Sequence, residues 1–188
     1  STTLMTAALL HAEGQRVGAT ISPHVRGWAE RIQVDGEDAD LERALERVRP
    51  HAEGATQFEV ITAAALAEFR EREVDVAVVE AGLGGRLDAT NVLDAPIVVL
   101  TSVARDHTEV LGETREEIAA EKLAVVTPGA VVILGEPEWA DLARENGAAR
   151  VDVVSRSNLA LATAAAEEHL GHRVDPHAAE RMQVPGRL

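Results

Sequence analysis

Apolar and polar residues alternate along the chain in blocks that predict helices and strands in turn. Residues 57–72, QFEVITAAALAEFRER, carry apolar side chains at positions 58, 61, 65, 66 and 69, which is the spacing of one helix face. Residues 74–79, VDVAVV, and 97–100, IVVL, are short runs rich in β-branched residues. Such runs are typical of strands that are buried on both faces of a parallel sheet. The alternation predicts an α/β fold with a doubly wound, mostly parallel sheet.

The rest of the chain continues this alternation. Further helices are expected at 2–14, 39–49, 116–126, 137–146 and 157–170, and further strands at 16–22, 31–34 and 131–134. Gly14 and Pro23 are stop signals for the first helix and the first strand, and Asp35-Gly36 predicts a turn. At Val154-Ser155 a strand-like segment runs almost directly into the last long helix.

Composition narrows the class of protein. The 188 residues include no cysteine, which excludes disulfides, zinc–cysteine sites and thiol catalysis. No stretch approaches the roughly 20 consecutive apolar residues that cross a bilayer, and no signal-peptide pattern is present. We therefore expect a cytoplasmic protein with no membrane partner. The net charge of −14 argues against a nucleic-acid partner, but a nucleotide held by backbone N–H groups and Mg²⁺ remains compatible with it.

Lysine usage is unusual. Seventeen arginines stand beside one lysine, Lys122. Arginine therefore occupies nearly every position at which a positive charge is needed. Lys122 either marks a site that requires an amine able to lose its proton, or it is a chance exception on a helix surface. Composition favours neither interpretation.

Three polar side chains follow predicted strands at points where α/β proteins bind ligands. Ser22 follows the first strand, Glu80 comes directly after VDVAVV, and His107 follows IVVL. The carboxyl ends of parallel strands meet at one edge of a sheet, so the three side chains could share a divalent cation. Oxygen ligands favour Mg²⁺, and the imidazole would also suit Mn²⁺. Taken singly, Ser22 is a turn residue, Glu80 a solvated acid and His107 a surface or capping residue.

Glycines cluster just after Glu80, in the stretch VVEAGLGGRLDATN (78–91). The dinucleotide-binding pattern G-x-G-x-x-G would need glycine or alanine at position 87, which is Leu87. No G-K-S or G-K-T sequence is present, so the chain as given holds no Walker A loop. The glycines therefore indicate a tight turn, or a close approach of the backbone to another group.

Several motifs, in order, resemble the folylpolyglutamate synthase/dihydrofolate synthase family, a group of ATP-dependent ligases related to the Mur ligases. They are SPH (22–24), TQFE (56–59), VVEAGLGGRLDATN (78–91), RDHTEVLG (105–112) and EK (121–122). The similarity runs from Ser1 to about Pro128 and resumes over Asn158–Arg187. It implies that ATP phosphorylates a carboxylate of dihydropteroate or folate, and that the amine of L-glutamate then attacks the acyl phosphate. It also implies a monomeric enzyme that works mainly by positioning and charge neutralisation.

The resemblance assigns roles to individual residues. The family's Mg²⁺ ligands match Ser22, Glu80 and His107, and Lys122 matches a lysine that family members carry as a carbamate, so Lys122 and His107 are the catalytic candidates. Substrate-contacting stretches match Thr56, Gln57, Phe58, Glu59, Leu87, Asp88 and Ala89, and ATP-contacting positions match Ser1, Thr2, Asn158 and Arg187. Without the resemblance, Phe58 belongs to the apolar stripe of its helix, Asn158 is a helix N-cap or a first-turn residue, and Arg187 is a terminal surface charge.

The match has gaps, and other functions stay open. A T-N-G-K-G-S-type phosphate loop is expected before Ser1, a further segment near 154–155, and a C-terminal domain that helps to bind glutamate after Leu188. Residues 1–188 are thus expected to form an incomplete Mur-ligase-like central domain. One alternative is a Mur-type ligase that acts on another carboxylate, and the other is a degenerate binding domain without chemistry. The motifs do not separate addition of the first glutamate from addition of later ones.

Overall fold

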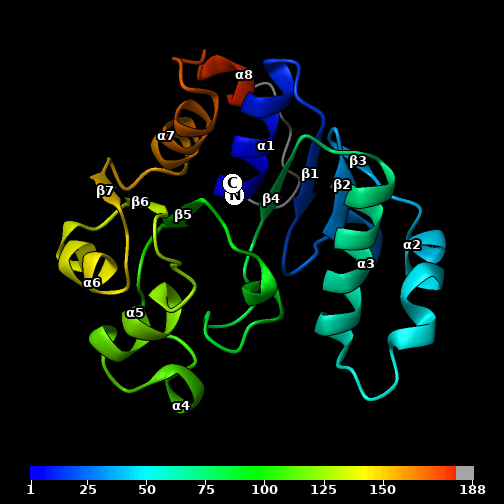
Figure 1. Cartoon of the computed structure of the whole chain (residues 1–188), viewed down its shortest axis with the longest axis horizontal. Coiled ribbons are helices and arrows are strands. Elements are labelled where there is room, and N and C mark those ends of the chain that lie inside the picture. Colours follow the sequence, from blue (N-terminus) through cyan, green and yellow to red (C-terminus); the bar gives the residue numbers. More distant parts are fainter. Residues whose placement is uncertain (181–188) are drawn as a thin grey trace. The chain divides into compact units, whose positions relative to one another are not determined.

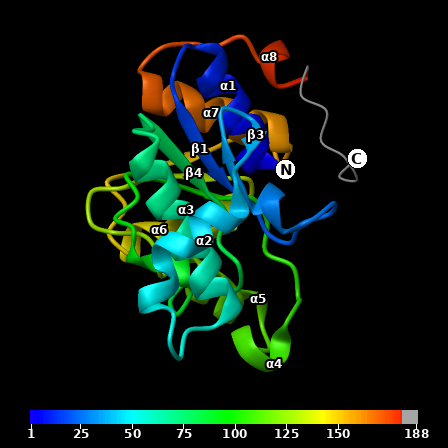
Figure 2. The same ribbon diagram turned by 90° about the vertical axis from the view of Figure 1, so that its right-hand side faces the viewer.

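The computed structural model describes residues 1–180, which form two compact units. The first contains Ser1, Thr3–Gly82 and the described residues from Val174 onward, and the second contains Thr2 and Leu83–Arg173. Each unit is a β-sheet with helices packed against it (Figure 1 and Figure 2). The predicted α/β class is therefore confirmed. No helix among residues 1–180 has the length and apolar character needed to cross a membrane.

The first unit is built on a mixed sheet with the strand order β3-β2-β1-β4. Its elements are α1 (Thr2–Ala12), β1 (Val17–Thr20), η1 (Trp28–Arg31), β2 (Ile32–Val34), β3 (Glu37–Asp38), α2 (Leu41–Val48), η2 (Arg49–His51), α3 (Gln57–Glu71), β4 (Val76–Val79) and α8 (His177–Glu180), where η denotes a 3-10 helix. β1 pairs antiparallel with β2 and parallel with β4, and Thr20 lies opposite Val79. The parallel pair brings the carboxyl ends of β1 and β4 to one edge of the sheet.

Neighbouring residues of β1 contact helices on opposite faces of this sheet, as the two-residue period of a strand requires. Ala19 packs with Leu4 of α1. Gly18 faces α3, where the ring of Phe69 would lie 2.5 Å from an added Cβ. Figure 1 shows α1 on one side of β1, and α3 with α2 on the other. β1 is therefore buried on both faces.

The second unit is built on a parallel sheet with the strand order β5-β6-β7. Its elements are η3 (Ala89–Val92), β5 (Ile97–Leu100), α4 (Thr108–Leu111), α5 (Arg115–Leu123), β6 (Val131–Leu134), η4 (Pro137–Trp139), α6 (Ala140–Glu145), β7 (Arg150–Val153) and α7 (Asn158–Leu170). Val132 and Leu134 of β6 pack in one cluster with Ile118 of α5, whereas Ile133 packs with Leu161 of α7. Helices thus cover both faces, which is the doubly wound arrangement expected from the sequence.

The prediction that β4 and β5 are buried on both faces is wrong. Ala77 of β4 is exposed, its three neighbours in the strand are only partly buried, and in β5 only Leu100 is fully buried. The reason is that each strand lies at the edge of its own sheet and pairs with one other strand among residues 1–180. The elements β3 and α4 were not predicted, because two or four residues are too few to show a periodic pattern.

Three buried carboxylates link the stability of the chain to pH. Glu30, Glu68 and Glu136 have exposed fractions of 5%, 3% and 6%. Burial alone would raise the pKa of Glu68, but hydrogen bonds and charges from two arginines outweigh it, so its pKa lies below the ordinary 4.5. The same balance, with other partners, lowers the pKa of Glu30 and of Glu136.

We expect the free energy of unfolding to be highest above about pH 4.5 and to fall as the pH drops through the lowered native pKa values. The unfolded chain takes up these protons first, so acid favours it. Urea unfolding at a series of pH values from 7 to 3 measures how steeply the free energy of unfolding falls with pH, which is the acid slope. Glu68→Gln should flatten the slope, whereas the control Glu53→Gln, at an exposed position, should leave it unchanged. An acid slope that is equally steep in Glu68→Gln and in the parent would contradict this account.

Candidate functional site

Two of the predicted metal ligands leave the first sheet at the same edge. β1 and β4 run parallel, and the N–H of Glu80 donates a hydrogen bond to the carbonyl oxygen of Thr20 (3.2 Å). Ser22 lies two residues beyond the end of β1, and Glu80 directly follows β4. Glu80 is half-buried, and its Oε2 atom is fully buried. The fold of the first unit thus places a hydroxyl and a carboxylate beyond the ends of two neighbouring strands.

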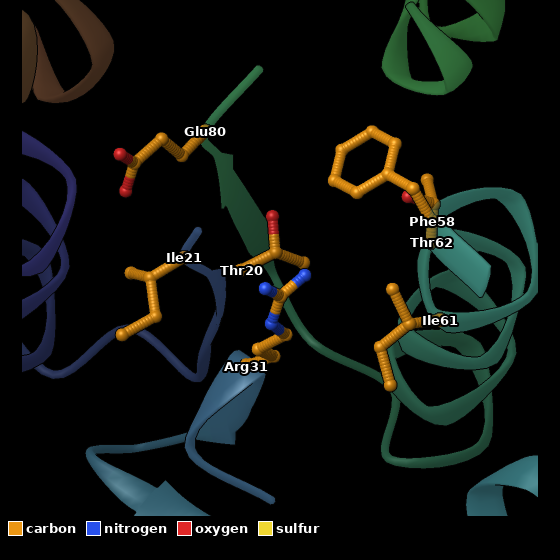
Figure 3. Close-up of a pocket in the computed structure, with 7 residues that line it drawn as sticks. All are labelled: Thr20, Ile21, Arg31, Phe58, Ile61, Thr62 and Glu80. Atoms are coloured by element: carbon orange, nitrogen blue, oxygen red, sulfur yellow. The ribbon is translucent and has the colours of Figure 1, made fainter. Parts of the chain in front are cut away.

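A small pocket lies beside these strand ends (Figure 3). Its walls come from β1, the end of η1, the first turns of α3 and the residue after β4. It is lined by Thr20, Ile21, Arg31, Phe58, Ile61, Thr62 and Glu80. In Figure 3 the Arg31 guanidinium points into the space between β1 and α3, and the Phe58 ring stands at the α3 side of that space. The pocket therefore brings an aromatic ring and a cation together within one unit, whereas the carboxylate of Glu80 points away from both in Figure 3.

Arg31 is the one charged residue among the five pocket residues that sequence reasoning missed. Its Nε donates a hydrogen bond to Nδ1 of His24 (2.9 Å), and its guanidinium lies 4.6 Å from the centre of the Trp28 ring. Burial lowers the pKa of Arg31, and the charge of Glu30 partly offsets this effect. The terminal amino groups of Arg31 have no hydrogen-bond partner within residues 1–180. The one signal in the sequence is a cation directly before the buried strand IQV.

Glu30 holds the loop that follows Ser22. Its carboxylate accepts hydrogen bonds from the backbone N–H groups of Val25 and Arg26, the second at 3.1 Å. It also accepts a hydrogen bond from Nε of Arg26 (3.1 Å). A buried acid thus fixes the backbone between β1 and η1, next to the candidate ligand Ser22.

The TQFE segment begins α3, and most of its side chains have structural tasks. Thr56 Oγ1 accepts a hydrogen bond from the N–H of Glu59 (3.2 Å), and the Glu59 carboxylate accepts one from the N–H of Thr56 (2.6 Å), which is a capping box. The hydrogen bond from the Thr56 backbone lowers the pKa of Glu59. Gln57 is exposed, and Phe58 packs against Gly82. Of the four predicted substrate contacts, only Phe58 lines the pocket.

The glycine-rich loop packs against the end of α5 in the second unit. A Cβ added at Gly85 would lie 2.6 Å from the carbonyl oxygen of Glu121 and 2.8 Å from that of Lys122. Gly84 has a φ of +73°, in the left-handed region that favours glycine. Arg86 donates to Glu121 from both its backbone N–H (3.2 Å) and its Nε (3.3 Å). The glycines therefore serve both a tight turn and a close approach of the backbone.

The buried Asp88 side chain joins the two ends of the same loop through hydrogen bonds. Its carboxylate accepts hydrogen bonds from the N–H of Leu83 (2.8 Å), the N–H of Thr90 (2.9 Å) and the hydroxyl of Thr90 (2.6 Å). It is the N-cap of η3, and only 9% of it is exposed. Leu87, by contrast, is 92% exposed, and Ala89 is partly buried. The structure thus gives Asp88 a role in shaping the loop and leaves Leu87 available for a ligand.

Lys122 and His107 both belong to the second unit. Lys122 is half-buried in the last turn of α5, and its ammonium group makes no hydrogen bond or ion pair within residues 1–180. His107 is the N-cap of α4 and adopts the left-handed region, with a φ of +53°. Its side chain is 54% exposed, and Nε2 lies 3.8 Å from Oδ2 of Asp106. No three His, Cys, Asp or Glu side chains form a metal-binding group in the described part of the chain, and the predicted set contains only two of these types.

Two of the predicted ATP-contacting residues touch each other. The hydroxyl of Thr2 donates a hydrogen bond to Oδ1 of Asn158 (3.0 Å). Asn158 is exposed and is the first residue of α7, whose N-cap is Ser157, so of the two expected positions it takes the first-turn one and not the N-cap. Ser1 is the N-cap of α1. Arg187 lies outside the described residues.

Residues 1–183 match the family described as Mur ligase middle domain. Dihydrofolate synthase/folylpolyglutamate synthase of Escherichia coli (strain K12) is 40% identical over 155 residues, which cover 75% of this chain and 36% of that protein. Folylpolyglutamate synthase of Lacticaseibacillus casei is 41% identical over 141 residues, which cover 69% and 33%. The chain thus spans about a third of the length of these curated relatives.

Solved structures show the same fold. Escherichia coli FolC in complex with DHPP and ADP aligns with a TM-score of 0.86 and 32% identity, and the alignment covers 99% of this chain and 55% of that chain. The bifunctional folylpolyglutamate synthase/dihydrofolate synthase of Yersinia pestis, complexed with AMPPNP and Mn ion, aligns with a TM-score of 0.84 and 30% identity, with coverage of 99% and 55%. The similarity therefore extends over nearly the whole of this chain.

Proposed function

The chain belongs to the Mur ligase family through its middle domain, and on this premise we propose that the protein is an ATP-dependent ligase that adds L-glutamate to dihydropteroate, to folates, or to both. The observation that carries the proposal is the position of Ser22 and Glu80 beyond the parallel strands β1 and β4, beside the pocket that Phe58 and Arg31 line. The names of relatives about 40% identical support this choice of substrates over another carboxylate. We further propose that the protein acts as a cytoplasmic monomer.

Ser22, Glu80 and His107 are the proposed ligands of a divalent cation. A hydroxyl, a carboxylate with a buried oxygen and an imidazole fit Mg²⁺, and they also fit Mn²⁺. The relative solved with AMPPNP and Mn ion supports the use of a divalent metal with ATP. When bound, such a cation neutralises charge on the phosphate oxygens. Thr2 and Asn158, joined by a hydrogen bond, are proposed to contact the nucleotide, together with Ser1 and Arg187.

The proposed reaction has two steps. An oxygen of the substrate carboxylate attacks the γ-phosphorus of ATP, the bond to the β-phosphate oxygen breaks, and ADP leaves. The amine of L-glutamate then attacks the carbonyl carbon of the acyl phosphate, phosphate leaves, and the nitrogen gives up a proton. In this reaction the Phe58 ring offers a flat surface to the pterin, and the terminal amino groups of Arg31 can donate to its acceptor atoms. Leu87, which is exposed on the glycine-rich loop, is a proposed substrate contact of the second unit.

Lys122→Arg is expected to lower kcat about 100-fold, a change of roughly 3 kcal/mol in the barrier. Arginine keeps the positive charge but cannot offer the uncharged amine that carbamate formation requires. Steady-state ADP release measures kcat, and depletion of bicarbonate should slow the parent but not the variant. Glu116→Gln, at an exposed position on the same helix, is the control and should match the parent. Unchanged kcat in Lys122→Arg would make the single lysine a chance surface residue.

Glutamate-dependent ADP release tests the proposed function in the full natural protein that carries these residues. Release that requires both L-glutamate and dihydropteroate or tetrahydrofolate supports the ligase, and a comparison of the two acceptors separates the first addition of glutamate from later ones. ATP consumption only with another amino acid or carboxylate would favour a Mur-type ligase of different specificity. A protein that consumes no ATP with any of these acceptors would be a binding domain without chemistry.

A further inference from the structure

Glu136 binds donors from four separate segments of the second unit. It is the second residue after β6 and is 6% exposed. Its Oε2 accepts hydrogen bonds from the N–H of Val103 (3.1 Å), Nη2 of Arg115 (2.9 Å) and Nε1 of Trp139 (2.9 Å). Its Oε1 lies 3.1 Å from Nη1 of Arg156. One carboxylate therefore links the loop after β5, the start of α5, η4 and the segment before α7.

These segments carry the residues assigned to catalysis and nucleotide binding. Val103 precedes His107 in the loop after β5, and Arg115 is the first residue of α5, the helix that ends near Lys122. Arg156 stands two residues before Asn158. The Glu136 carboxylate is thus the common partner of three segments that the proposed function uses.

Most of the contacts around Glu136 support the fold. Arg115 also donates from Nε to the carbonyl oxygen of Val103 (2.9 Å), pairs with Glu138 (2.6 Å) and lies 5.2 Å from the centre of the Trp139 ring. Burial alone would raise the pKa of Glu136, but its hydrogen bonds and the two arginines lower it, so the carboxylate stays charged. Removal of this acid would leave several buried donors without an acceptor.

The contact with Arg156 is of a different kind. The Arg156 side chain is 61% exposed, whereas that of Glu136 is 8% exposed. An exposed arginine contributes little to the stability of the fold. It still restrains the short stretch between β7 and α7, because it anchors that stretch to a buried, fixed carboxylate. Loss of this anchor should affect the position of Asn158 more than it affects folding.

We propose that Glu136 is a positioning residue for nucleotide binding and that it acts through the ion pair with Arg156, which holds the start of α7 so that Asn158 meets the nucleotide. This inference rests on the proposed function and deepens it. The three other donors hold the Glu136 carboxylate in place, and the ion pair with Arg156 then holds the segment before α7 against that carboxylate. Arg156 does not touch the nucleotide in this arrangement.

A double-mutant cycle on the full natural protein tests the inference. Arg156→Ala, Glu136→Gln and the double variant are titrated with ADP in the presence of Mg²⁺ by calorimetry, and Tm is measured for each. Arg156→Ala should raise the Kd of ADP about 10-fold with only a small fall in Tm, and Glu136→Gln should raise Kd to a similar extent and lower Tm much more. The double variant should have the Kd of Glu136→Gln alone, because both changes break one interaction. Arg144→Ala removes another exposed arginine that pairs with an acid, and should leave Kd unchanged.

The outcomes separate this inference from the proposed function. A parent protein that binds neither ADP nor ATP overturns the proposed function and the inference together. A parent that binds ADP, with the same Kd in Arg156→Ala, overturns the inference alone. Additive losses in the double variant also overturn it, because Arg156 would then act independently of Glu136.

Discussion

Replacement of Glu80 by glutamine is expected to lower kcat/KM of the ligase reaction about 1,000-fold, or roughly 4 kcal/mol, while the protein stays folded. The amide is nearly the same size as the acid but carries no charge, so it is a much weaker ligand for Mg²⁺ than the carboxylate. The backbone hydrogen bond from Glu80 to Thr20 does not involve the side chain and should persist. The loss should therefore fall on metal binding and catalysis rather than on the sheet.

Two measurements separate these effects. Glutamate-dependent ADP release gives kcat/KM, and titration with Mn²⁺, followed by electron paramagnetic resonance, gives the affinity of the metal. Ser22→Ala removes a neutral ligand and should weaken Mn²⁺ binding less than Glu80→Gln does. Glu53→Gln, at an exposed position of the same unit, should match the parent in both assays. Parent-like Mn²⁺ affinity in Glu80→Gln would rule Glu80 out as a metal ligand.

Gly85→Ala is expected to have the second large effect, a loss of activity of about 100-fold together with a destabilisation of about 1–3 kcal/mol. Its Cβ would lie 2.6 Å and 2.8 Å from the carbonyl oxygens of Glu121 and Lys122. Both obstacles are backbone atoms of α5, which cannot move aside as a flexible side chain can. Either the glycine-rich loop or the end of α5 must shift, and with it Leu87 or Lys122.

Gly27 provides the matched control for this substitution. It has an extended backbone with a φ of 174°, and an added Cβ would meet no atom within 4 Å. Gly27→Ala should therefore leave both the activity and the free energy of unfolding near the parent values. Thermal unfolding and ADP release on both variants make the comparison. If Gly85→Ala keeps the parent activity, the contact of the loop with α5 has no part in the reaction.

The order of elements could be read from the sequence, because the patterns that encode it are local. The apolar stripe of α3 and the β-branched run of β5 appear within single windows, and both elements are where they were predicted. The placement of Ser22 and Glu80 at one sheet edge also follows from the predicted parallel sheet, because each residue comes just after a strand and β1 and β4 do pair in parallel. The family membership rested on motifs in sequence order, and the comparisons bear it out.

Long-range packing decided the features of the site that the sequence did not predict. Arg31 enters the pocket because η1 turns it toward α3, Gly85 is required because α5 returns to the glycine-rich loop, and Glu136 gathers donors from segments up to 33 residues away. No window of sequence contains both partners of such contacts, so periodicity cannot reveal them. The exposure of β4 and β5 has the same origin, since an apolar run shows that a strand forms but not how many neighbours pair with it. The sequence by itself determined the elements, their order and the candidate ligands at the strand ends, and only the tertiary structure decided which side chains hold those ligands in place.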